Sequence, residues 1–102
     1  MSIFVISDNS ERYRVRKEDS GCTIFSTRCY LEANDTVYEV LRLISEKGVK
    51  GCIDELYSLY PDESDEITND LIELAENFTQ EGVFLELSKE LKTALYAGEC
   101  EC

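Results

Sequence analysis

Histidine and tryptophan are absent from this sequence of 102 residues, and proline occurs once. Without histidine the chain lacks the commonest general base, the imidazole ligand of metal sites and the usual switch near neutral pH. Ser–His and Cys–His pairs for nucleophilic catalysis are excluded for the same reason. The carboxylate pairs at 62–63 and 65–66 lie where acidic residues favour the start of a helix. We therefore expect a protein without catalytic activity and without a cofactor.

Long hydrophobic runs are also lacking. No stretch approaches the roughly 18 apolar residues of a membrane span, and residues 1–8 have no basic region of the kind that begins a signal peptide. The five cysteines are an odd number at irregular spacing, which is not the pattern of a disulfide framework. These features predict a cytoplasmic protein whose thiols are reduced.

Two of the cysteines, Cys100 and Cys102, form a C-x-C pair. Two thiolates can begin a zinc site, but a closed zinc site has four ligands, so Cys22, Cys29 or Cys52 would have to join them. The pair could instead form a cross-link or respond to the redox state, or lie in a frayed tail without function. We favour the frayed tail and expect no bound metal.

Cations are scarce, because 10 Lys and Arg residues face 22 Asp and Glu residues and the formal net charge is −12. Residues 51–88 contain no lysine or arginine, whereas half of the basic residues lie between positions 12 and 28. Such an acidic surface repels phosphate backbones and anionic lipid headgroups. We therefore expect neither nucleic acid nor a membrane as a partner.

Alternating hydrophobicity predicts strands in the first third of the chain. Residues 12–17 alternate arginines with apolar residues, which indicates a half-buried strand with a basic outer face. Residues 3–7 are a further, short candidate strand. The runs 22–25 and 28–31 are separated by two residues and predict a hairpin. The predicted hairpin places four side chains on one face, namely Cys22, Ile24, Cys29 and Leu31.

From residue 35 onward the apolar spacing changes to that of helices. The first predicted helix is capped by Asn34 or Asp35 and ends at Gly48, and the second, short helix over 53–60 is stopped by Pro61. A third starts at Ser64 or Asp65 and ends at Gly82.

The order of strands first and helices second predicts a small α+β domain. We expect a winged-helix-like fold in which a three-stranded antiparallel sheet is followed by three helices. The predicted domain spans residues 1–86, with its core at 12–85. Residues 87–102 are expected to be a tail that adds a turn or two of helix and then frays.

A winged helix raises the question of DNA binding. A recognition helix in the major groove needs cations for phosphates and base edges. The third predicted helix, over 64–82, has none and would present a negative face to a polyanion. A winged-helix adaptor that binds a protein or, less readily, DNA therefore stays an alternative and not the leading hypothesis.

Three segments follow the predicted strands in a characteristic order. Residues 34–41 (NDTVYEVL) are similar to an N-E-T-A-x-E-I-L segment, and apolar positions recur at 53–61 and 70–83. In this order the stretch 12–84 resembles the PqqD-like family, also called the RiPP recognition element. Its members are small domains that bind the leader of a ribosomally made precursor peptide. The sequence departs from the family at Ala33, where leucine is usual, and at Val37-Tyr38, where the family has two alanines.

The resemblance implies that a leader adds as an extra strand along the third strand of the sheet and packs against the third helix. This is β-augmentation, in which backbone groups of a strand edge give affinity and a neighbouring apolar groove selects side chains. The corresponding edge residues are Thr27, Arg28, Cys29, Tyr30 and Leu31.

The third predicted helix suggests the other wall of this groove. Successive residues of this helix are placed about 100° apart around its axis. The apolar residues that face the core form an inward stripe, and one flank of this stripe carries no charge. The opposite flank is acidic or amide and consists of Asp70, Asn77 and Glu81. We expect the uncharged side to bind the peptide, through Thr68, Leu71, Ile72, Ala75 and Thr79. In the alternative interpretation, Ile72 only widens the apolar arc to meet Val83 or the C-terminal tail.

The leading hypothesis is a stand-alone peptide chaperone that presents the leader to a modifying enzyme, often a radical S-adenosylmethionine enzyme in this family. A second hypothesis within the family is a leader-binding protein of a lasso-peptide system, which delivers the precursor to a leader peptidase. The catalytic cofactors would then belong to the partner. An open strand edge can also pair with a second copy, so a monomer and a homodimer both stay open.

Overall fold

A computed structural model describes residues 3–99, with side chains from 3 to 96. It is an α+β fold in which an antiparallel sheet of four strands, in the order β1-β2-β3-β4, precedes three helices. The strands are β1 (Ile3–Asp8), β2 (Glu11–Lys17), β3 (Cys22–Phe25) and β4 (Tyr30–Ala33). The helices are α1 (Asp35–Leu59), α2 (Ser64–Glu81) and α3 (Leu85–Glu99), with a short 3-10 turn η1 (Pro61–Glu63) before α2.

The prediction of a three-stranded sheet is wrong, because residues 3–8 form a full edge strand. β1 pairs with β2 along its whole length, from Ile3 opposite Arg16 to Asp8 opposite Glu11. The side chain of Ile6 is buried in the core. Six residues are too few to predict this strand from their own sequence. The strand is stabilised by its pairing with β2 in the long β1–β2 hairpin.

The second hairpin is shifted from its predicted register. β4 begins at Tyr30, two residues later than expected, and the Ser26 N–H donates to the Cys29 carbonyl across the turn. Leu31 then lies opposite Ile24, and the two side chains share one face of the sheet, as predicted. Cys29 lies in the turn, where its Sγ is 3.4 Å from the Ser26 hydroxyl oxygen.

The predicted ends of the helices are confirmed where a local cap defines them. The Asn34 side chain accepts the Val37 N–H at 2.9 Å at the start of α1. Gly48 has φ 83° and breaks α1 into two helical halves, and Gly82, with φ 78°, ends α2. A side chain at either position would strain the left-handed backbone. The second half of α1 begins directly after Gly48 and so is longer than the predicted 53–60.

The structure also differs from the expected tail. Residues 85–99 form α3, a helix of 15 residues, so the predicted boundary at 86 falls inside a helix. Leu87, Leu91 and Leu95 recur every fourth residue and are buried against the rest of the molecule. This spacing gives α3 one apolar face, which packs mainly on α2. Cys100 and Cys102 lie outside the described residues.

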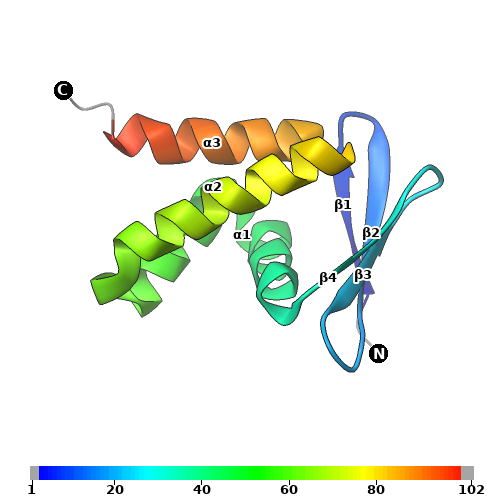
Figure 1. Ribbon diagram of the computed structural model, residues 1–102, viewed down its shortest axis with the longest axis horizontal. Helices are drawn as coiled ribbons and strands as arrows, with labels where there is room; N and C mark the ends of the chain where they lie inside the picture. Colours follow the sequence, from blue (N-terminus) through cyan, green and yellow to red (C-terminus); the bar gives the residue numbers. More distant parts are fainter. Residues whose placement is uncertain (1–2, 100–102) are drawn as a thin grey trace.

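All three helices lie on one side of the sheet (Figure 1). The core between the two layers contains Val15 and Ile24 from the sheet and Leu41, Phe84 and Leu91 from the helical part, all with no exposed surface. No helix within residues 3–99 covers the other face of the sheet, and Tyr30 is 66% exposed there. β4 is therefore an edge strand that meets the start of α1 and faces α2 across a hollow.

Candidate functional site

The free edge of the sheet at β4 offers backbone groups for pairing. The sheet order makes β4 an outermost strand. Because Ser26 and Cys29 form a hydrogen-bonded pair across the turn, antiparallel alternation directs the backbone groups of Leu31 toward β3. The N–H and C=O groups of Tyr30 and Glu32 then point away from the sheet. One more strand could bind at these groups.

An apolar hollow lies directly beside this edge. It has a volume of about 360 Å³ and separates β4 from the second half of α2. Leu31 lines it from the strand, Val37 from α1, and Leu74 and Phe78 from α2. Leu31, Val37 and Leu74 are half-buried, so their apolar surface is still available. A side chain of a strand added to β4 would enter this hollow.

Two further hollows continue from the first along the α1–α2 seam. One of about 380 Å³ is lined by Val40 and Leu71, and another of about 310 Å³ by Leu56 and Ile67. We call the three hollows together the α1–α2 groove. Its full apolar lining consists of Leu31, Ala33, Val37, Val40, Leu56, Tyr60, Ile67, Leu71, Leu74 and Phe78.

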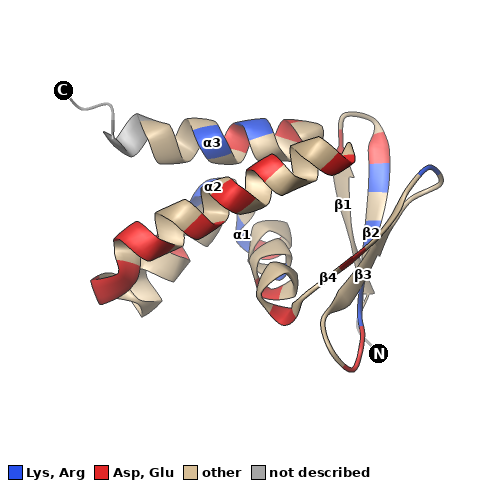
Figure 2. Ribbon diagram, in the orientation of Figure 1, with Lys and Arg blue, Asp and Glu red and all other residues tan. Residues whose placement is uncertain are grey.

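The charges that line the groove are all negative. Asp70, Glu73 and Glu81 project from α2 along its length, Glu63 lies at the far end, and Glu32 lies at the β4 end. None of these five takes part in the ion pairs found among residues 3–99. Figure 2 shows the acidic residues along α2 and the basic residues on β2, in the sheet. The groove therefore favours a cationic occupant.

The structure brings part of the predicted site together. Leu31 lines the first hollow and Leu71 the second, on facing sides of the same groove. Tyr30 belongs to the free edge and directs its side chain to the outer face of the sheet. Thr27 and Arg28 are exposed in the β3–β4 turn beside the half-buried Cys29.

The uncharged side of α2 is not the wall of this groove. Thr68, Ile72, Ala75 and Thr79 line none of the three hollows. Glu76, one turn after Ile72 on the same flank, pairs with Lys92 of α3 at 3.9 Å. The Thr68 hydroxyl contacts the Tyr57 hydroxyl of α1. This flank of α2 therefore contacts α1 at Thr68 and α3 at Glu76.

The sequence prediction missed the residues that do form the wall. They are Asn77 and Glu81 on the acidic and amide flank of α2, and Leu74 and Phe78 on the adjoining apolar stripe. A signal was present, because Leu74 extends the apolar stripe toward that flank. The sequence alone could not assign Leu74 to a groove, because that assignment depends on the side of α2 on which α3 packs.

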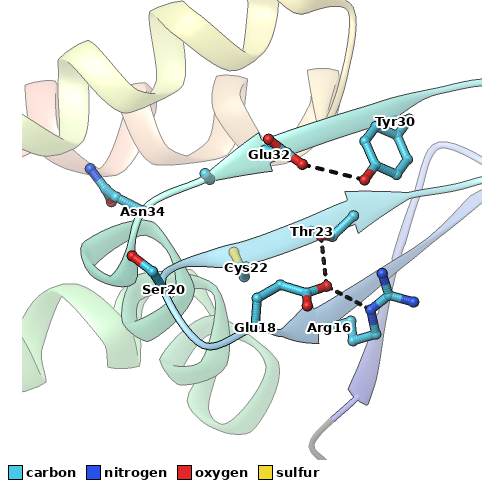
Figure 3. Close-up of a pocket in the computed structure, with 9 residues that line it drawn as sticks. Arg16, Glu18, Ser20, Cys22, Thr23, Tyr30, Glu32 and Asn34 are labelled. Atoms are coloured by element: carbon cyan, nitrogen blue, oxygen red, sulfur yellow. Dashed lines mark hydrogen bonds and ion pairs between the residues drawn. The ribbon is translucent and has the colours of Figure 1, made fainter.

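Another hollow, of about 580 Å³, lies on the outer face of the sheet (Figure 3). Three of its polar side chains are partners of one another, since the Glu18 carboxylate accepts from Arg16 Nε at 2.7 Å and from the Thr23 hydroxyl at 2.9 Å. The buried Cys22 beside it is not activated, because burial raises the pKa of its thiol. We interpret this network as a support for the β2–β3 turn.

Two carboxylates near this turn make stability depend on pH. Hydrogen bonds from Arg16 and Thr23 lower the pKa of Glu18, and the Gly21 N–H and Lys17 lower the pKa of Asp35. A lowered pKa stabilises the folded state above the normal carboxyl pKa of about 4. That stabilisation is lost as the pH falls through the lowered value.

We expect the urea midpoint of the protein to fall on acidification below about pH 4. The double variant Glu18→Gln/Asp35→Asn should be less stable at neutral pH and lose less on acidification. Denaturation curves followed by circular dichroism at several pH values would measure this difference. Equal losses for both proteins would contradict the assignment.

Comparison with family models, curated proteins and solved structures found no match for this chain. Within residues 3–99, no helix is long and apolar enough to cross a membrane. No group of three or more Cys, Asp or Glu side chains in the described part of the chain could hold a metal. The similarity to the PqqD-like family stays a prediction from the sequence.

Proposed function

We propose that this chain is a stand-alone peptide chaperone. It binds the leader of a ribosomally synthesised precursor peptide by β-augmentation and presents it to a modifying enzyme, of the radical S-adenosylmethionine class. The winged-helix-like fold expected from the order of strands and helices is part of the same proposal. The observation that carries it is the free β4 edge beside an apolar hollow lined by Leu31, Leu74 and Phe78.

The free β4 edge supplies affinity for the peptide backbone, and the apolar hollow selects its side chains. The outward N–H and C=O groups of Tyr30 and Glu32 pair with the backbone of any extended segment, and so give affinity without selecting a sequence. Alternate side chains of the added strand face the hollow. Burying one leucine or isoleucine there contributes about 1.5–3 kcal/mol. An apolar residue at a fixed position of the leader is therefore the expected recognition element.

The proline of the variant Glu32→Pro tests the strand pairing. Its ring removes the outward N–H of Glu32, and proline is tolerated on an edge strand where that N–H faces solvent. Losing one hydrogen bond and leaving its acceptor unpaired costs about 2–3 kcal/mol, which weakens binding by about 30-fold or more. Glu32→Ala is the matched control, because it removes the same carboxylate and keeps the N–H.

The measurement is fluorescence anisotropy of a labelled leader peptide, taken from a precursor encoded beside the gene of this chain. Circular dichroism would show that both variants keep the wild-type fold. In an NMR titration of the wild type, the resonances of residues 30–33 and 74–81 should move together. Equal affinity of the two variants would exclude strand addition at β4, and absence of binding to the wild type would exclude the proposed function.

A further inference from the structure

The groove is longer than the edge strand that it borders. β4 has four residues, whereas α2 has 18 and extends about 27 Å at 1.5 Å per residue. Val37 and Leu74 line both the first and the second hollow, and Val40 and Leu71 line both the second and the third. The apolar lining is therefore continuous from β4 to the end of α1.

The far end of the groove exposes apolar surface that strand addition at β4 does not cover. Leu56 and Ile67 are half-buried there, and Tyr60 is 50% exposed. All three line the third hollow, which shares no lining residue with the hollow beside β4. An occupant of this part must arrive from the β4 end or bind separately.

The charge of the lining selects the class of occupant. Glu63, Asp70 and Glu73 belong to the second and third hollows, which no lysine or arginine lines. On the opposite flank of α2, by contrast, Glu76 is paired with Lys92. Unpaired carboxylates beside an apolar floor complement a segment that has both apolar and cationic side chains.

We propose that the bound peptide has a second, basic and apolar segment that occupies the α1–α2 groove beyond β4. This inference rests on the proposed function and names the chemistry of the peptide that it requires. β4 ends at Ala33, and Asn34 and Val37 line the groove directly after it. A strand paired with β4 therefore continues into the groove. Lysine or arginine side chains of the segment lie along the carboxylates of α2, and its apolar side chains contact Val40, Leu71 and Ile67.

A charge-neutral triple variant tests this segment. Glu63→Gln/Asp70→Asn/Glu73→Gln removes the three carboxylates of the second and third hollows. The matched control is Asp54→Asn/Asp65→Asn/Glu90→Gln, which changes the net charge equally at exposed positions that line no part of the groove. Three surface ion pairs together are expected to account for about a tenfold change in affinity.

The leader peptide should bind the groove variant about tenfold more weakly than the control, and its binding should depend less on salt. A leader whose basic residues are replaced by glutamine should not distinguish the two proteins. The methyl resonances of Leu56 and Ile67 should shift with the full leader and not with a peptide cut to the strand segment.

Equal affinities of the two triple variants would overturn the inference. If the leader still required the Glu32 N–H, the proposed function would stand with a shorter peptide. Absence of leader binding to the wild type would instead remove the proposed function, and the inference with it. Methyl shifts at Leu56 and Ile67 that persist with the cut peptide would also overturn it, because the second segment would then not be their cause.

Discussion

Phe84→Ala will lower the free energy of unfolding by about 3–5 kcal/mol, the cost of removing a large ring from a packed core. Phe84 has no exposed surface. Its ring centroid lies 4.4 Å from that of Tyr13 on β2 and 5.1 Å from that of Phe78 on α2. One side chain thus joins the sheet, α2 and the start of α3. A loss of this size is a large fraction of the stability of a typical domain.

At Phe84, the free energy gained by burying the ring exceeds the cost of an unfavourable backbone conformation. Its φ is 51°, in the left-handed region that is unfavourable for a bulky residue by about 1–3 kcal/mol. The packing of the ring and a hydrogen bond from the Ser88 N–H to the Phe84 carbonyl hold the backbone there. Leu85→Ala is the control, because the neighbouring Leu85 is 44% exposed and should cost about 0.5 kcal/mol or less.

Urea denaturation followed by circular dichroism would measure both variants. Because Phe78 packs on Phe84 and also lines the first hollow, the Phe84 variant should bind the leader more weakly even where it is folded. A loss below about 1 kcal/mol would show that the core closes around the missing ring and that Phe84 is not its centre.

The helix ends could be predicted because each depends on residues that are close in sequence. Asn34 caps α1 through an N–H three residues away, and Gly48 and Gly82 adopt backbone angles that suit glycine. The half-buried pattern of β2 is equally local. Such features were assigned at the correct residues without any knowledge of the fold.

The groove could not be placed in this way, because its position depends on contacts across the whole chain. Ile72 and Leu74 are both apolar residues at the edges of the inward stripe of α2. Which of them faces a groove is decided by the side on which α3 packs, and α3 was expected to be a frayed tail. The buried residues Leu87, Leu91 and Leu95 show on which side of α2 the helix α3 packs, but only when α3 is known to be a full helix.

The start of α3 depends on a residue at the other end of the chain. Asp8, the last residue of β1, is 8% exposed, and its carboxylate accepts the N–H of Glu86 at 3.1 Å and that of Leu87 at 2.7 Å. The first N–H groups of a helix have no partner within the helix, and a capping side chain normally comes from the residue before it. That residue is Phe84, whose side chain has no oxygen to accept a hydrogen bond. Asp8 therefore acts as an N-cap from a distant strand.

Asp8→Ala should lower the free energy of unfolding by about 2–3 kcal/mol, because it leaves two backbone donors unpaired in a buried place. Asp8→Asn keeps one oxygen acceptor and should lose about half as much. Ser7→Ala, at an exposed position of the same strand, is the control.

Hydrogen exchange distinguishes the local effect of losing the Asp8 cap from a general loss of stability. In the Asp8→Ala variant, the amides of Glu86 and Leu87 should exchange faster by a larger factor than the amides of β2. In the Phe84→Ala variant, the amides of β2 and α2 should be affected as well, because the ring joins both. Uniform acceleration along the chain in the Asp8 variant would exclude a capping role. Since α3 packs on α2, loss of the cap should also loosen the α2 wall of the α1–α2 groove.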